Sequence, residues 1–259
     1  MLYDARKKGL IMNGTRMQNK FSLLLRTSLL FIILVMPGCT PDKSTLLDHE
    51  TQQNMSPDQV LHNLIAGNKR FISNTPLHRS NLQIKGAKAS EVGQFPKAVI
   101  LACMDSRSIP EIIFDVSVGD IFTLRVAGNI VTEAMIGSME YGTKYAGAKL
   151  IVVLGHTQCG AVQAACKGVK AGNLPYVINP IVPAVDTIAS RSTSKNCDED
   201  SFVTQIALQN VHNMMQLIIQ KSPVIKELIA SKEVAIVGAL HDLASGVVKF
   251  EFTEGLHSS

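Results

Sequence analysis

The chain has 259 residues, of which 46% are hydrophobic, 18% charged and only 5% aromatic, which is ordinary composition for a globular protein able to bury a sizeable core. Six of its 25 basic residues and one of its 21 acidic residues lie within residues 1–39, so the formal net charge of +4 becomes about −1 for the rest. A nearly neutral body with few aromatic side chains argues against a nucleic-acid partner.

The first 39 residues are expected to be an export signal rather than part of the fold. Arg16, Lys20 and Arg26 form a positive n-region, and the apolar run over 29–36 is far short of the roughly 20 residues that span a bilayer. A small residue precedes Cys39, as in a bacterial lipoprotein signal whose cysteine is lipidated. Simple secretion with cleavage nearby is the alternative. We therefore expect a periplasmic protein whose membrane contact is limited to a lipid anchor.

A tether and a helix are predicted after this signal. Residues 40–56 are polar and show no periodicity, so we interpret them as the tether. Ser56 is a suitable N-cap in front of Pro57, and the residues that follow predict an amphipathic helix over about 57–73. Residues 74–95 are polar and are expected to be irregular.

Short apolar runs then predict the strands of a sheet, over 98–102, 121–126, 150–154 and 234–240. The first, third and fourth are rich in β-branched residues and alternate little, which is typical of strands buried on both faces of a parallel sheet. A fifth run, over 246–252, alternates as an edge strand does. Helical stretches lie between the strands, over 133–146, 160–170, 178–190 and 200–231. This order predicts an α/β fold, with a mostly parallel central β-sheet flanked by helices and an N-terminal helical arm.

Two motifs lie where predicted strands end. The strand over 98–102 runs into Cys103, and the strand over 150–154 runs into His156 and Cys159. The carboxyl ends of parallel strands meet at one edge of a sheet, so these side chains are expected to converge. Two cysteines and one histidine form a suitable ligand set for zinc, whose catalytic sites keep three protein ligands and one open position. A disulfide, which would remove the ligands, is the alternative in an exported protein.

Asp105 and Arg107 follow the first cysteine closely. Asp105 can bind the metal or stand beside the metal-bound water, and Arg107 can hold its carboxylate in a charge-assisted pair that lowers its pKa. An ordinary surface ion pair is the alternative. Because both residues follow a buried strand into the predicted cleft, the functional interpretation is favoured.

With these motifs the chain resembles the β-class carbonic anhydrases, over roughly residues 57–254. The sequence CMDSR at 103–107 matches the family pattern C-x-D-x-R, and HTQCG at 156–160 matches H-x-x-C-G. GDIF at 119–122 and RVAGN at 125–129 fall where the family carries two further segments. The resemblance implies that residues 57–259 form a β-carbonic anhydrase domain.

The resemblance also implies an activity and its residues. Cys103, His156 and Cys159 would hold one zinc ion per subunit. Asp105 and Arg107 would orient a zinc-bound hydroxide for attack on CO2, giving bicarbonate and a proton. The substrate pocket would be formed by matching positions, some of them from the other subunit: Gln94, Phe122, Ala127, Tyr141 and the backbone of Gly160. The arm over 57–73 implies a homodimer or a higher homo-oligomer.

Two other functions stay open at this point. One is hydrolysis of a CO2-like sulfur compound, carbonyl sulfide or carbon disulfide. The other is a non-catalytic zinc protein of the same fold.

Three further positions carry expectations of their own. Ile100 stands where members with a regulatory bicarbonate pocket have tryptophan, so that pocket is expected to be incomplete, although Arg125 and Tyr141 are present. Cys166 is expected to be a packed core thiol and Cys197 an exposed loop residue, with a disulfide between them as the alternative.

Overall fold

The computed structural model describes residues 46–193 and 195–256. The predicted export signal, Cys39 and the first part of the predicted tether (40–45) lie outside the described residues. Within the described ranges, no helix has both the length and the apolar character needed to cross a membrane.

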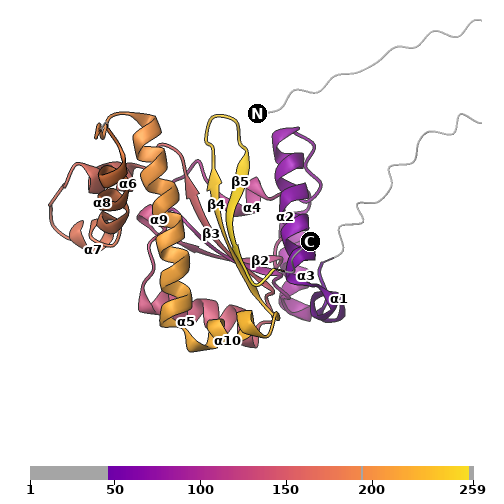
Figure 1. Ribbon diagram of the computed structural model, residues 1–259. Helices are drawn as coiled ribbons and strands as arrows, with labels where there is room; N and C mark the ends of the chain where they lie inside the picture. Colours follow the sequence, from indigo (N-terminus) through magenta and orange to yellow (C-terminus); the bar gives the residue numbers. More distant parts are fainter. Residues whose placement is uncertain (1–45, 194, 257–259) are drawn as a thin grey trace, which may run out of the picture. The chain divides into compact units, whose positions relative to one another are not determined.

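A five-stranded sheet lies at the centre of residues 46–256, as Figure 1 shows. Its strands are β1 (Ala98–Ala102), β2 (Ile121–Arg125), β3 (Leu150–His156), β4 (Ala235–His241) and β5 (Val248–Glu254). They are ordered β2-β1-β3-β4-β5, and β5 alone of these pairs antiparallel, against β4. The predicted mostly parallel sheet with an edge strand at its end is confirmed.

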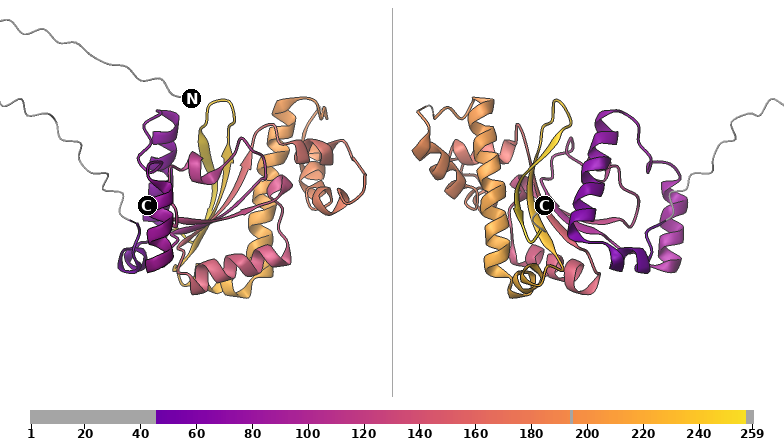
Figure 2. Two further views of the ribbon diagram at one scale, coloured as in Figure 1. Left: turned by 180° about the vertical axis from the view of Figure 1, so that it is seen from behind. Right: turned by 45° about the vertical axis from the view of Figure 1, so that its right-hand side comes forward.

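Helices cover both faces of the sheet. The helical elements in chain order are α1 (His49–Asn54), α2 (Pro57–Ile72), α3 (Leu82–Val92), α4 (Pro110–Ile113), the 3-10 turn η1 (Ala127–Asn129), α5 (Glu133–Glu140), the π-helical turn η2 (Tyr141–Tyr145), α6 (Gly160–Cys166), α7 (Pro175–Ile178), α8 (Val182–Arg191), α9 (Asp200–Lys221) and α10 (Pro223–Ala230). Figure 2 shows α9 against one face and α2 on the other. The flanking helices of the predicted fold are therefore present.

Each buried strand contributes to two cores because successive side chains point to opposite faces. In β1, Val99 and Leu101 pack toward α9, α5 and α10, whereas Ala98, Ile100 and Ala102 pack toward α2 and α4. All five β1 residues are buried. Burial on both faces explains why this strand is an unbroken apolar run in the sequence.

The arm helix α2 begins as predicted. Ser56 caps it by accepting a hydrogen bond from the backbone N–H of Gln59, and the side chain of Gln59 returns one to the backbone N–H of Ser56. Pro57 occupies the first turn, where a missing N–H costs no helical hydrogen bond.

The prediction of an irregular segment over 74–95 is wrong in part, and the predicted tether contains a short helix. Residues 49–54 form α1, capped by Asp48, and Gln52 is buried, where it donates hydrogen bonds to the carbonyls of Pro96 and Ala146 at 2.7 Å each. Residues 82–92 form α3. Both helices are short and polar, and α1 is held by one buried amide rather than by an apolar stripe, so hydrophobic periodicity does not reveal them.

The expectation of a packed Cys166 thiol is also wrong, because Cys166 forms a disulfide with Cys197. Helix α6 ends at Cys166, and Gly168, with a φ of 64°, closes the helix end. The loop before α9 folds back along α6, where Gln163 donates to the carbonyl of Cys197 and Lys167 pairs with Asp198. Spacing along the chain could not reveal this proximity.

Candidate metal centre and active site

Two strand ends bring Cys103, His156 and Cys159 together. β1 and β3 are parallel neighbours with Ala102 opposite Leu154, so Cys103, directly after β1, and His156, the last residue of β3, reach the same edge. Cys159 follows as the N-cap residue of α6. The two sulfurs and a ring nitrogen of His156 all lie within 4.8 Å of one another, and all three side chains are buried. The predicted convergence of the two motifs is present.

The orientation of His156 suits a metal ligand. Its Nδ1 lies 2.8 Å from the carbonyl oxygen of Thr157, which can only accept, so Nδ1 carries a proton and Nε2 is the ring nitrogen available to a metal. Nε2 is buried and has no hydrogen-bond partner among the described residues. A buried nitrogen beside two sulfurs and without a partner fits a metal-binding role.

The two thiols are electrostatically coupled. The pKa of Cys103 is lowered to about 4, first by its hydrogen bond with Cys159, with further contributions from His156 and from the N–H groups of Asp105 and Gly128, against the effect of burial. The same hydrogen bond raises the pKa of Cys159, and burial raises it further. The pair thus favours one thiolate and one thiol. A divalent cation between the sulfurs would replace the shared proton.

Asp105 and Arg107 form a two-pronged ion pair beside this cluster. Arg107 donates from Nε to Oδ1 at 3.0 Å and from Nη2 to Oδ2 at 2.8 Å, and its backbone N–H also reaches Oδ1. These hydrogen bonds hold the pKa of Asp105 well below its usual range. Asp105 Oδ2 lies 3.9 Å from His156 Nε2. An ionised carboxylate of fixed direction therefore borders the cluster.

Three further hydrogen bonds hold the loop that carries this pair. Arg125 donates from Nε to the carbonyl of Cys103 at 3.0 Å and from Nη2 to that of Asp105 at 2.6 Å. On the other side, Ser108 Oγ lies 3.1 Å from Nδ1 of His241 on β4. Burial, followed by the nearby His156, lowers the pKa of His241 to about 4, so this contact involves a neutral ring.

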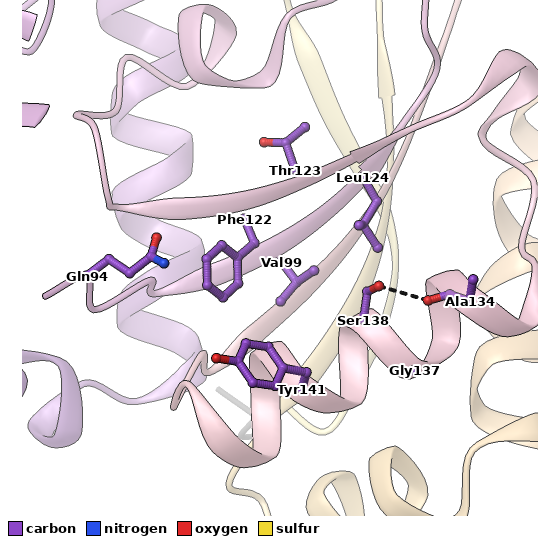
Figure 3. Close-up of a pocket in the computed structure, with 9 residues that line it drawn as sticks. All are labelled: Gln94, Val99, Phe122, Thr123, Leu124, Ala134, Gly137, Ser138 and Tyr141. Atoms are coloured by element: carbon purple, nitrogen blue, oxygen red, sulfur yellow. Dashed lines mark hydrogen bonds between the residues drawn. The ribbon is translucent and has the colours of Figure 1, made fainter. Parts of the chain in front are cut away.

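A separate cavity gathers three of the predicted substrate residues. Gln94, Phe122 and Tyr141 line an open cavity of about 490 Å³ between β2 and α5, and Figure 3 shows their side chains facing it. Cys103, His156 and Cys159, all within the described part of the chain, do not line it. Ala127 and Gly160 also lie elsewhere, in η1 and at the start of α6. The predicted substrate positions are therefore divided between two places in one chain.

Comparison with known proteins assigns this arrangement to a family. The fold is similar to that of a chain from the tetrameric β-carbonic anhydrases of Sordaria macrospora, with a TM-score of 0.58 and 25% identity over 74% of this chain and 96% of that one. The model of the carbonic anhydrase family matches residues 98–248. The chain belongs to the β-carbonic anhydrase family.

Curated relatives agree with this assignment. Carbonic anhydrase 2 of Mycobacterium tuberculosis is 37% identical over 74% of this chain and 92% of its own length. The carbonic anhydrase of Mycolicibacterium smegmatis is 32% identical over 76% of this chain and 94% of its own length. A β-carbonic anhydrase of Aspergillus fumigatus has the same fold, with a TM-score of 0.59 at 24% identity. The chain is thus an enzyme of the carbonic anhydrase kind.

Sequence reasoning missed some residues around the site of this carbonic anhydrase. The sequence relates Arg125 to a regulatory pocket and to the RVAGN segment, whereas the structure makes it a hydrogen-bond partner of the Cys103 loop. Ser108 and His241 carry no local signal, because 133 residues separate the two. Their contact depends on the pairing of β3 with β4, which places His241 opposite His156.

Proposed function

We propose that this carbonic anhydrase catalyses the zinc-dependent, reversible hydration of CO2 to bicarbonate and a proton. The observation that carries the proposal is the buried group of Cys103, His156 and Cys159, with ligand atoms within 4.8 Å of one another and the Asp105–Arg107 pair beside it. The three residues would hold one zinc ion per subunit through Sγ, Nε2 and Sγ. When bound, zinc lowers the pKa of a coordinated water from about 15.7 to about 7 and so supplies a nucleophile near neutral pH.

The Asp105–Arg107 pair would orient that nucleophile. Asp105 remains ionised because Arg107 lowers its pKa, so its carboxylate can only accept a hydrogen bond. The fork of Arg107 fixes both carboxylate oxygens, and Arg125 holds the backbone of the same loop. A rigid acceptor directs a hydrogen of the nucleophile away from CO2 and leaves a lone pair for the attack.

Bicarbonate would be bound by the first turn of α6. The N–H of Gly160 belongs to the first residue of that helix and has no acceptor within it, so it could donate to an oxygen of the product. Ala127 lies in η1 beside Gly128, whose N–H points toward Cys103. We assign both residues to the chain's own active site.

The remaining substrate residues argue for a homo-oligomer. Gln94, Phe122 and Tyr141 share a cavity that the chain's own cluster does not line, so they would serve the site of a neighbouring subunit. The proteins of Sordaria macrospora that share the fold are described as tetrameric. We propose that this chain forms at least a dimer, in which α2 contacts the neighbour.

We also propose that the protein is exported and anchored through a lipid on Cys39. The Cys166–Cys197 disulfide supports an oxidising compartment, because such bonds are rare in proteins that stay in the cytosol.

Stopped-flow CO2 hydration and zinc analysis of the same preparation test the enzymatic proposal. We expect about one zinc ion per chain and hydration that is lost when zinc is removed and regained when it is returned. Carbonyl sulfide and carbon disulfide should be the poorer substrates, because the named relatives are carbonic anhydrases. Zinc-loaded protein that does not accelerate CO2 hydration would refute the proposal.

A further inference from the structure

The turn η1 lies directly over one of the two clustered sulfurs. The backbone N–H of Gly128 donates a hydrogen bond to Cys103 Sγ, with the two atoms 3.4 Å apart in a buried setting. Gly128 has a φ of 69°, and a Cβ at this position would lie 2.6 Å from Cδ1 of Ile181 and 3.3 Å from Cβ of Ala161. Both the backbone conformation and the lack of space require glycine here.

A side chain from α9 holds the other side of the same glycine. Asn210 is fully buried, and its Nδ2 donates to the carbonyl oxygen of Gly128 at 3.0 Å. That carbonyl can only accept, so the amide nitrogen must face it and the direction of the hydrogen bond is settled. The two residues are 82 positions apart in the chain.

Asn210 is an unfavourable choice for packing alone. Its neighbours along the buried side of α9 are apolar, among them Ala207, Val211 and Met214. Its Oδ1 has no hydrogen-bond partner within the described ranges, and a buried acceptor left unpaired destabilises a protein. An apolar side chain of the same shape would avoid that cost, which argues for a role beyond packing.

We propose that Asn210 is a positioning residue for the metal centre, acting through the peptide groups of Gly128 on the sulfur of Cys103. Glycine has the widest backbone freedom of any residue, so a turn centred on it needs anchors. Here the N–H of Gly128 is held by the sulfur and its carbonyl by Asn210. Without the side-chain amide of Asn210, the turn is free to rotate the N–H of Gly128 away from Cys103. This inference rests on the metal site of the proposed function.

The hydrogen bond has a chemical effect on the sulfur. An N–H that points at a thiolate withdraws charge from it, so the sulfur donates less strongly to a bound metal. Partners of this kind around a metal site typically change metal affinity by about 10- to 100-fold. Asn210 therefore tunes both the direction and the donor strength of Cys103, without touching the metal or the substrate.

The test compares Asn210→Leu with Asn213→Leu in the full chain loaded with cobalt(II). Asn213 lies on the same helix three residues later, where it accepts a hydrogen bond from Gln209. Loss of the N–H contact raises the energy of the sulfur lone pairs. The thiolate-to-cobalt absorption band should therefore move to longer wavelength in Asn210→Leu and stay at the wild-type position in Asn213→Leu. Zinc affinity, measured by competition with a chelator, should change by about tenfold or more in Asn210→Leu and stay at the wild-type value in Asn213→Leu.

Asn210→Ala removes the same donor without any steric demand and should give the same shift if the leucine variant does not fold. A wild-type band and wild-type zinc affinity in a folded Asn210 variant would overturn the inference. A wild-type protein that binds cobalt without a thiolate band would overturn both the inference and the zinc assignment. Hydration of CO2 is measured separately, so an inactive wild type with the expected band shifts would refute the proposed function and leave this inference standing.

Discussion

The Sγ atoms of Cys103 and Cys159 lie 4.0 Å apart although 56 residues separate the two cysteines. A disulfide would need about 2.05 Å, so neither cysteine is in a disulfide, while the same chain joins Cys166 to Cys197. The disulfide that would have removed the ligands is therefore not formed. The separation leaves room for an ion between the sulfurs, and the following predictions begin there.

Replacing Cys159 with alanine should abolish both zinc binding and CO2 hydration. Two protein ligands hold zinc far less tightly than three, and the remaining thiolate would lack the cation that stabilises it. Metal analysis and stopped-flow hydration measure the two losses. The double variant Cys166→Ala/Cys197→Ala is the control, since it removes two cysteines outside the cluster and should keep its zinc. A Cys159→Ala protein with full zinc and full activity would rule out the ligand assignment.

Asp105 and Arg107 should act as one unit in turnover. Asp105→Asn and Arg107→Ala should each lower kcat strongly, because the fork of the arginine is what directs the carboxylate. The double variant should lose little more than the worse single variant. Steady-state hydration kinetics on all four proteins give the comparison. Independent, multiplicative losses would argue against a coupled pair.

Asp115 should stabilise the fold above acid pH. Burial opposes ionisation of this fully buried carboxylate, but the N–H groups of Leu77 and His78 and the side chain of Arg70 outweigh it and lower its pKa. A carboxyl group with a lowered folded-state pKa stabilises above its unfolded pKa of about 3.9, and the contribution disappears as pH falls through the folded value.

Asp115→Asn should therefore lower the free energy of unfolding by about 1–3 kcal/mol at pH 7, and the difference from wild type should shrink below about pH 4. Thermal unfolding followed by circular dichroism at several pH values measures this. Asp186→Asn, an exposed change on α8, should have no such effect. If Asp115→Asn lowers the free energy of unfolding equally at pH 3 and pH 7, the stabilisation does not come from the ionised carboxylate.

Cys39→Ala should release the protein from membranes. A lipidated cysteine anchors the chain, and the described part contains no helix that could replace it. Cell fractionation with an antibody gives the distribution, and wild type should be found with the membrane fraction. Wild-type protein in the cytoplasm with residues 12–39 still attached would refute export.

Bicarbonate should not inhibit strongly from a second site. Ile100 is fully buried toward α2 and offers no donor, and Arg125 already donates to the carbonyls of Cys103 and Asp105. A missing donor to a buried anion costs about 1–3 kcal/mol, or roughly ten- to a hundredfold in affinity. Hydration rates against added bicarbonate at constant pH and ionic strength provide the measurement. Steep, cooperative inhibition would contradict the prediction.

Local patterns in the sequence determined the sheet and the core of the site. The apolar run over 98–102 matched β1 residue for residue, because a strand buried on both faces needs no polar position along its length. Cys103, His156 and Cys159 followed from the rule that parallel strands bring their carboxyl ends to one edge. These inferences needed only neighbouring residues and the order of elements.

The tertiary structure decided which other distant residues meet. It joined Cys166 to Cys197, docked α1 through Gln52, and set Asn210 against the turn over Cys103. It also separated the cavity of Gln94, Phe122 and Tyr141 from the cluster of the same chain. Each of the first three contacts joins segments far apart in sequence through only one or two atoms. Such atoms leave no periodic pattern in the chain, and their partners are set only when whole helices and strands pack.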